Sequence, residues 1–200
     1  MPNQPILSAK FIQTEAKLIV EYAVQNGDQP VLLLNRLIHL GSPLTADDQK
    51  VYRFVVGNSL RLLLGPAPLP DFRQVHSKNV PQLVRLNAHQ YYKEGFALER
   101  PVTEYSCYSA FEPQLTADAV VQDVTLFADY VEAQAVRVRA STLLPDAFEA
   151  ESSIARDRIH RLSSSVEPLT IPVRKFRDDF PRLRLHGEPV TLPPPRRLEF

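Results

Sequence analysis

Large apolar side chains occupy every second position of residues 17–24, so they lie on one face of an extended strand. A second apolar run covers residues 31–38. Asn26 and Gly27 lie between the runs, and both tolerate the positive φ that a type I′ turn requires. The pattern therefore predicts a β-hairpin over residues 17–38.

Two further hairpins are predicted from alternation and turn residues. In residues 49–64, two apolar runs flank Gly57-Asn58, a pair that suits a type I′ or II′ turn. In residues 120–141, a long alternating run is followed by a second one after Glu132-Ala-Gln134. The predicted core consists of Leu18, Val20, Tyr22, Phe54, Leu62, Val124, Leu126, Val136 and Val138.

Three other segments carry weaker patterns. Residues 81–92 and 166–173 read as strands, and prolines at the margins of the second favour a sheet edge. Residues 146–162 contain good helix formers, with acidic residues early and basic residues late, which complements a helix dipole. A short helix is expected there.

Strands separated by turns, without alternating helices, predict an all-β fold, an antiparallel two-sheet sandwich. We expect one domain over residues 1–187 and a proline-rich C-terminal tail over 188–200. The apolar strand 18–24, the turn Asn26-Gly-Asp-Gln-Pro30 and the strand that follows resemble the opening of bacterial immunoglobulin-like domains. The resemblance implies an immunoglobulin-like sandwich and transfers no functional residue. The cysteine pair and core tryptophan of antibody domains are absent.

Composition narrows the function classes. The chain has 23 basic and 23 acidic residues and a formal net charge of zero, so no overall field would attract nucleic acid. Eighteen prolines in 200 residues favour rigid loops over long helices. No apolar run approaches the ~20 residues of a membrane span, and no signal-peptide pattern is seen, so a cytoplasmic protein is expected, or a periplasmic one if a leader has been trimmed.

Residues with catalytic or metal-binding chemistry are scattered. The five histidines lack the short spacings of a zinc site, and Cys107 is the single cysteine. No nucleophile elbow, phosphate-binding loop or dinucleotide fingerprint occurs. We therefore expect neither a metal nor an organic cofactor.

One cluster of aromatic residues stands out between residues 91 and 111. Tyrosine combines a large contact area with a hydroxyl group, which suits a surface that binds a partner. The alternative is that these rings close one end of the sandwich. The predicted partner-binding residues are Tyr91, Tyr92, Tyr105 and Tyr108, with Phe96 and Phe111 in the same cluster.

The leading functional hypothesis is a non-enzymatic β-sandwich module that binds or scaffolds another protein. A carbohydrate- or small-ligand-binding sandwich that uses residues 91–111 is the first alternative. The second is a hydrolase whose catalytic site is assembled by the fold from distant residues, since such constellations are defined by geometry. Fold class alone does not discriminate among the three.

Overall fold

The predicted all-β fold is confirmed. The computed structural model describes residues 3–38, 51–65, 80–105, 116–142, 146–152 and 154–176. These residues form a three-stranded sheet and a ten-stranded sheet, and most strand pairs are antiparallel. Within the described ranges, helical structure is limited to short 3₁₀ turns, and no helix is long and apolar enough to cross a membrane.

The strands are β1 (Ile6–Gln13), β2 (Lys17–Gln25), β3 (Val31–Ile38), β4 (Tyr52–Val56), β5 (Ser59–Leu64), β6 (Val80–Leu86), β7 (Tyr91–Glu99), β8 (Val102–Thr103), β9 (Thr116–Glu132), β10 (Val138–Ala140), β11 (Phe148–Ala150), β12 (His160–Ser163) and β13 (Glu167–Phe176). The 3₁₀ turns among the described residues are η2 (Ala133–Ala135) and η3 (Arg156–Arg158).

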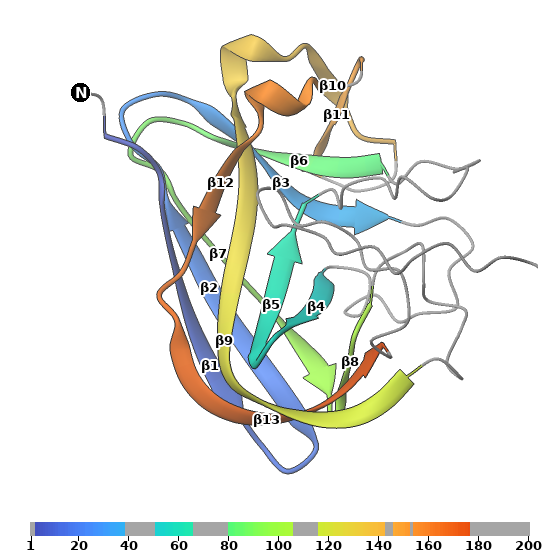
Figure 1. Cartoon of the computed structure of the whole chain (residues 1–200). Coiled ribbons are helices and arrows are strands. Elements are labelled where there is room, and N and C mark those ends of the chain that lie inside the picture. The colour runs from blue at the N-terminus through green and yellow to red at the C-terminus, as the bar shows by residue number, and fades with distance from the viewer. Residues whose placement is uncertain are drawn as a thin grey trace, which may run out of the picture.

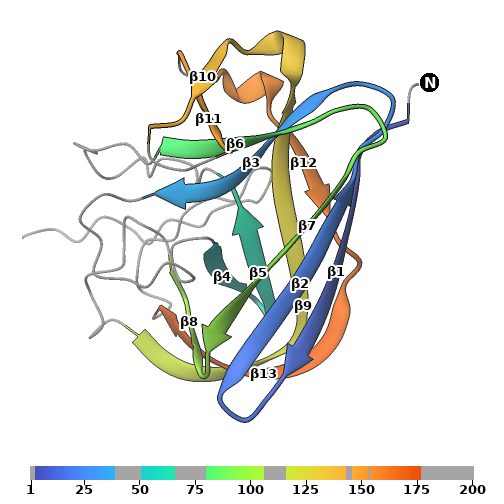
Figure 2. The ribbon, with the colours of Figure 1, turned by 180° about the vertical axis from the view of Figure 1, so that it is seen from behind.

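The three-stranded sheet has the order β1-β2-β7, and both of its ladders are antiparallel. Figure 2 shows β2 between β1 and β7, in front of the larger sheet. The side chains of β2 alternate between the core and the outside, because successive residues of a strand point to opposite faces of its sheet. This sheet therefore has one buried face and one outward face.

The 17-residue strand β9 is the long central strand of the larger sheet, as Figure 1 shows. One edge of β9 pairs first with β5, in parallel, and then with β3. The opposite edge pairs first with β13 and then with β12, both antiparallel. A second parallel contact joins β13 to β8. β9 thus pairs directly with four strands, which are β3, β5, β12 and β13.

The main core lies between the two sheets. It includes Leu18, Val20, Tyr22, Leu62, Val124 and Leu126, all predicted to be buried. Phe54 is buried as well. Val136 and Val138 are only partly buried, because they cover a second, smaller cluster.

That second cluster explains the continuous apolar run of β3. Val31 and Leu33 face the main core, whereas Leu32 and Leu34 face the smaller cluster. A strand covered on both faces carries apolar side chains at consecutive positions. The smaller cluster is completed by Leu83, Val131, Val136, Val138, Phe148, Ile154 and Ile159.

The predicted hairpin over residues 49–64 is confirmed as β4 and β5. Gly57 has a φ of 58°, and the following Asn58 has no positive φ, which is the combination that a type II′ turn requires. A two-residue turn of this type matches the twist of the flanking strands, so the sequence signal was sufficient here.

The predicted hairpin over residues 17–38 is wrong, although both of its strands exist. β2 pairs with β1 and β7, whereas β3 pairs with β6 and β9, so the connection passes from one sheet to the other. Gly27 does not adopt the left-handed region. Instead the buried Asn26 amide donates to the carbonyl oxygens of Gln29, Leu86 and Asn87, and these bonds hold the crossing segment.

The predicted hairpin over residues 120–141 is also wrong. β9 continues to Glu132, and η2 then turns the chain away from it. β10 pairs with β11 instead, because β3 and β12 already occupy both edges of β9 near its end. Because a strand has two edges and both edges of β9 are paired there, residues 138–140 cannot pair with β9.

The helix expected over residues 146–162 is not formed. This segment contains β11, the single 3₁₀ turn η3 and β12. Phe148, Ile154 and Ile159 lie over the second cluster, and an extended chain spreads them across it. Tertiary packing therefore overrides the helix-forming residues, as it does for weak local propensities.

The remaining strand predictions are confirmed with changed bounds. The segment 81–92 is divided into β6 and the start of β7 by the turn at residues 87–90. The segment 166–173 is β13, which pairs with β9 on one side. The predicted sheet edge is only partly formed, because the other side of β13 pairs with β8 at Val173 and Arg174. The tail predicted over residues 188–200 and the domain end at 187 lie outside the described residues.

A candidate binding face on the three-stranded sheet

The outward face of β1, β2 and β7 is built from cross-strand rows. One row is Ile6, Gln25 and Tyr91, and the next along the strands is Ser8, Ala23 and Lys93. Lys10, Glu21 and Gly95 form the third row, and Ile12, Ile19 and Ala97 form the fourth. Their neighbours along each strand, such as Val20 and Phe96, point into the core. Small residues thus lie together at the centre of the face.

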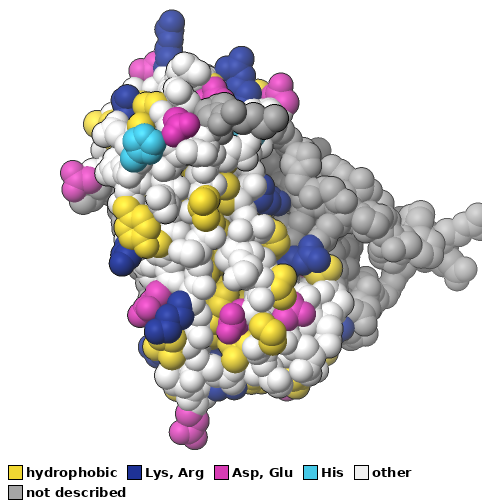
Figure 3. Space-filling view, turned by 90° about the vertical axis from the view of Figure 1, so that its left-hand side faces the viewer, with side chains coloured by type: hydrophobic (Ala, Val, Ile, Leu, Met, Phe, Trp, Pro, Cys, Tyr) yellow, Lys and Arg dark blue, Asp and Glu magenta, His cyan; other side chains and the backbone are white. Residues whose placement is uncertain are grey.

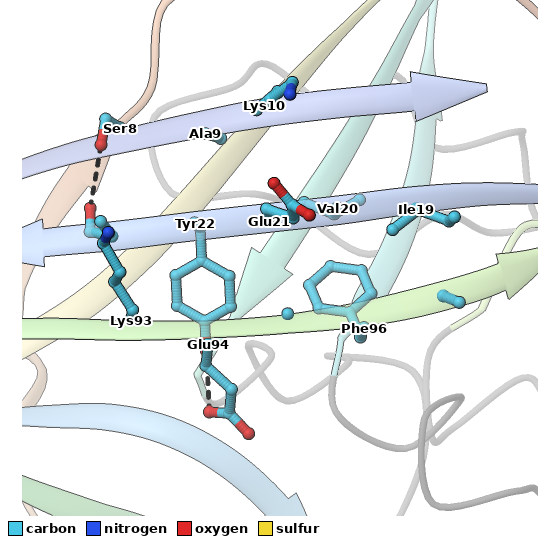
Figure 4. Close-up of a pocket in the computed structure, with 13 residues that line it drawn as sticks. Ser8, Ala9, Lys10, Ile19, Val20, Glu21, Tyr22, Lys93, Glu94 and Phe96 are labelled. Carbon is cyan, nitrogen blue, oxygen red and sulfur yellow. Dashed lines mark hydrogen bonds between the residues drawn. The ribbon is translucent and has the colours of Figure 1, made fainter.

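A shallow hollow of about 730 Å³ covers this centre. Its lining consists of consecutive residues from each strand, 8–10 from β1, 19–23 from β2 and 93–97 from β7. None of these lining residues comes from the larger sheet, so the hollow opens outward and not into the core. Figure 4 shows Lys10, Ile19, Glu21 and Lys93 around it.

The floor is low because three neighbouring positions carry little or no side chain. Ala23 and Ala97 contribute one methyl group each, and Gly95 contributes none. A Cβ at residue 95 would lie 2.9 Å from the carbonyl oxygen of Val20, closer than real Cβ atoms come. Close approach of β2 and β7 therefore favours glycine at this position.

Charged and aromatic groups surround the floor. Lys93 Nζ lies 5.2 Å from the centroid of the Tyr91 ring, within cation–π range. Tyr91 is 54% exposed and Ile6, at the far end of its row, is 65% exposed. Lys17 and Glu99 form an ion pair of 3.1 Å at the opposite end. Figure 3 shows the side of the molecule that lies on the left in Figure 1, and there charged side chains of both signs are interspersed with apolar ones.

The structure separates the tyrosines that the sequence grouped. Tyr92 points away from the outward face, and its hydroxyl donates to Glu94, as does that of Tyr22. Tyr105 is buried, stacks on Tyr52 at 5.9 Å and lies under the Arg53 guanidinium. A surface shared by Tyr91, Tyr92 and Tyr105 is therefore not formed, because Tyr105 is packed in the interior. Tyr108 lies outside the described residues.

A second polar arrangement surrounds Glu149 on β11. Its Oε1 accepts hydrogen bonds from the Ser141 hydroxyl at 3.0 Å and the Thr142 amide at 3.3 Å, and its Oε2 accepts one from Arg139 at 3.2 Å. The Ser141 bond is the largest influence on the pKa of Glu149 and lowers it. Burial acts in the opposite direction, but the bonds from Thr142, Arg139 and Gln82 lower the pKa further.

We expect the stabilising contribution of Glu149 to depend on pH. The folded-state pKa lies below the ordinary value of 4.5, so the contribution is present above that value and is lost as the pH falls through the folded-state pKa. Urea midpoints of wild type and Glu149→Gln between pH 7 and 3 should differ most at pH 7 and converge in acid. Glu151→Gln, an exposed neighbour, is the control. A difference that stayed constant with pH would contradict the assignment.

The described residues hold no group of three histidine, cysteine, aspartate or glutamate side chains placed to bind a metal ion. Two histidines can be located. His89 lies in the turn before β7, and the His160 ring packs 5.1 Å from that of Tyr130. Cys107 and the other three histidines lie outside the described residues.

The sequence did not indicate the floor of the hollow. Tyr91 belonged to the predicted aromatic cluster, but Ala23, Gly95 and Ala97 have no chemistry that marks them. Period two from residue 91 to 97 places Tyr91, Lys93, Gly95 and Ala97 on one face of β7, and this was the available signal. Their meeting with Ala23 depends on the register of β2 against β7, which one strand does not encode.

Comparison with protein-family models, curated proteins and solved structures gives no match to this chain. The resemblance of its opening to immunoglobulin-like domains therefore stays a prediction.

Proposed function

We propose that this chain is a non-enzymatic β-sandwich module that binds an extended segment of another protein on the outward face of β1, β2 and β7. The observation that carries the proposal is the hollow of about 730 Å³, with the exposed Tyr91 ring beside it. Its volume lies within the range of ordinary ligand sites, but it is open along the sheet surface. An extended segment matches this shape better than a small compact ligand.

The partner is recognised by side chains and not by sheet extension. The backbone of β2, which crosses the middle of the hollow, is already paired with β1 and β7. The three strands span about 10 Å, two strand spacings, which accommodates one extended chain lying on the face. An apolar side chain of that segment would contact the methyl groups of Ala23 and Ala97 and the Tyr91 ring.

Charge on the face favours a segment that carries a carboxylate. Lys17 and Glu99 neutralise each other in their ion pair. Four other charged residues line the hollow. Lys10, Lys93 and Glu21 lie on the outward face, whereas Glu94 lies on the opposite face of β7, where it accepts hydrogen bonds from the hydroxyls of Tyr22 and Tyr92. The outward face therefore has an excess of one positive charge, and one lysine lies on each side of the floor. A partner with an acidic residue next to an apolar one complements this arrangement.

Carbohydrate binding is the second candidate, and the Tyr91 ring supports it. An exposed aromatic ring at the margin of a shallow hollow offers a flat apolar surface, on which a sugar ring can pack. Of the described tyrosines on the outward face, Tyr91 is the one so placed. Protein binding is preferred because the apolar contact area extends beyond this ring to Ile6, Ile12 and Ile19.

The test selects peptides from a random display library on the full chain and measures their affinities by calorimetry. Selected peptides should combine apolar and acidic residues. Tyr91→Ala, which removes an exposed aromatic anchor, should weaken binding by about 10-fold or more. Ala97→Arg, which fills the floor, should weaken it at least as much. Gln122→Arg, the same kind of change at an exposed position on β9, should leave the affinity unchanged.

Two results would contradict the proposal. Peptides whose affinities are insensitive to both Tyr91→Ala and Ala97→Arg would place the binding surface elsewhere. Failure to select any peptide, together with glycan-array binding that is lost in Tyr91→Ala, would replace protein binding by the carbohydrate alternative.

A further inference from the structure

Strand β1 forms one edge of the three-stranded sheet. One side of β1 is paired with β2 along all eight residues, without a shift in register. Among the described residues no strand pairs with its other side, which lies at the margin of the sheet in Figure 2. Bulges and prolines commonly protect such an edge, and β1 contains neither. A regular strand edge is therefore open to pairing with another strand.

The turn between β1 and β2 shows which backbone groups point to the open edge. The Thr14 amide donates to the Lys17 carbonyl oxygen at 2.8 Å, and these two residues continue the register of the ladder. Opposed residues of an antiparallel ladder exchange hydrogen bonds at every second position. The even-numbered residues of β1 therefore bond to β2. The N–H and C=O groups of Leu7, Ala9 and Phe11 point to the open edge.

The sequence of β1 is complementary to a second copy of itself. An antiparallel arrangement with Ala9 opposite Ala9 of the second copy places Leu7 opposite Phe11, and Ile6 opposite Ile12. The first two pairs are those whose backbone groups point to the open edge, so they would exchange hydrogen bonds. Leu7 and Phe11 lie on the core face, whereas Ile6 and Ile12 lie on the outward face, so apolar side chains meet on both faces.

The charge of Lys10 favours this register over its neighbours. With Ala9 on the two-fold axis, Lys10 lies opposite Ser8 of the second copy. A register with Lys10 on the axis would oppose two like charges, which destabilises a sheet. A register with Ser8 on the axis would place Phe11 opposite Pro5, which has no N–H to donate.

We propose that β1 pairs with β1 of a second copy of this chain and joins the two three-stranded sheets into one continuous sheet. The contact is the same on both copies, as a two-fold axis requires. Ile6, which is 65% exposed in the single chain, contacts Ile12 of the second copy. Both outward faces lie on the same side of the joined sheet, because the axis is perpendicular to it. The pairing uses backbone groups of β1 and does not depend on peptide binding.

Sedimentation velocity of the full chain measures the association, over a series from low micromolar to several hundred micromolar concentration. Wild type should change from monomer to dimer. Ala9→Pro removes the N–H at the centre of the contact, so it should raise the Kd of the dimer by about 10-fold or more. This N–H makes no bond to β2, so the variant should stay folded, which circular dichroism checks.

Two charge variants test the register. Ser8→Glu places a carboxylate opposite Lys10 at two symmetric positions of the dimer, so it should lower the Kd by about 3-fold or more. Ser8→Lys opposes two lysines at each of these positions and should raise the Kd by about the same factor. Gln122→Glu and Gln122→Lys, the same charge changes at an exposed position of β9, should leave the Kd unchanged.

A chain that stays monomeric throughout the concentration series would overturn the proposal. If selected peptides then lost affinity in Ala9→Pro, the open edge would be assigned to a segment of another protein. A dimer whose Kd responds to neither Ala9→Pro nor the two Ser8 variants would use a different surface and would also overturn it. Should Ala9→Pro fail to fold, the Ser8 variants decide, and equal Kd values for the two would contradict the pairing of β1 with itself.

Discussion

Leu126→Ala is expected to lower the free energy of unfolding by about 2–5 kcal/mol, the range for removing a fully buried leucine. Leu126 is 0% exposed and belongs to the main core. It lies on β9 directly opposite Leu62 of β5, which is equally buried. The loss combines the transfer free energy of the removed carbon atoms with the cavity that remains, because strands paired along both edges of β9 restrict collapse.

Equilibrium denaturation in urea measures this loss, with Gln122→Ala as the matched control. Gln122 lies on the same strand but is exposed, so its truncation should change the free energy of unfolding by less than about 0.5 kcal/mol. A loss below about 1 kcal/mol for Leu126→Ala would mean that the core face of β9 has been assigned wrongly.

The sequence was sufficient to predict strands but not their partners. Alternation in residues 17–24 places Leu18, Val20 and Tyr22 on the core face, and the structure confirms it. Asn26-Gly27 favours a hairpin by local chemistry, yet the Asn26 amide bonds to Leu86 and Asn87, about sixty residues away. Such distant acceptors are created by the fold, so no local pattern could have indicated them.

The number of free strand edges is a second reason why strand partners could not be predicted from the sequence. Local alternation makes residues 135–141 a natural partner for the strand before them, but β9 has both edges occupied there by β3 and β12. Pairing is thus a competition among all strands of the chain. The three-residue strand β10 finds no free edge on β9 and pairs with β11 instead.

The candidate binding face was only partly predictable, because it too depends on how strands pair. Tyr91, which is exposed on this face, was part of the aromatic cluster that the sequence indicated. The hollow itself arises because Ala23 of β2 lies beside Lys93, while Gly95 and Ala97 follow on the same face of β7.

Two arginine–aspartate pairs on β9 allow the effect of burial to be measured at constant chemistry. Arg161 on β12 is opposite Asp129, and Arg174 on β13 is opposite Asp118. The Arg161 guanidinium makes two bonds to Asp129, of 2.8 and 3.0 Å, and the Asp129 side chain is 1% exposed. Arg174 and Asp118 are 3.2 Å apart, and both side chains are largely exposed.

Arg161→Met should therefore lower the free energy of unfolding by about 2–4 kcal/mol. Methionine keeps much of the apolar stem but leaves the buried Asp129 carboxylate without this guanidinium, and losing one partner of a buried pair costs about 3–5 kcal/mol. The partial exposure of Arg161 reduces that figure. Arg174→Met should cost at most about 1 kcal/mol, as is typical of exposed ion pairs. Urea denaturation of both variants gives the comparison, and equal losses would show that burial of Asp129 does not determine the strength of the pair.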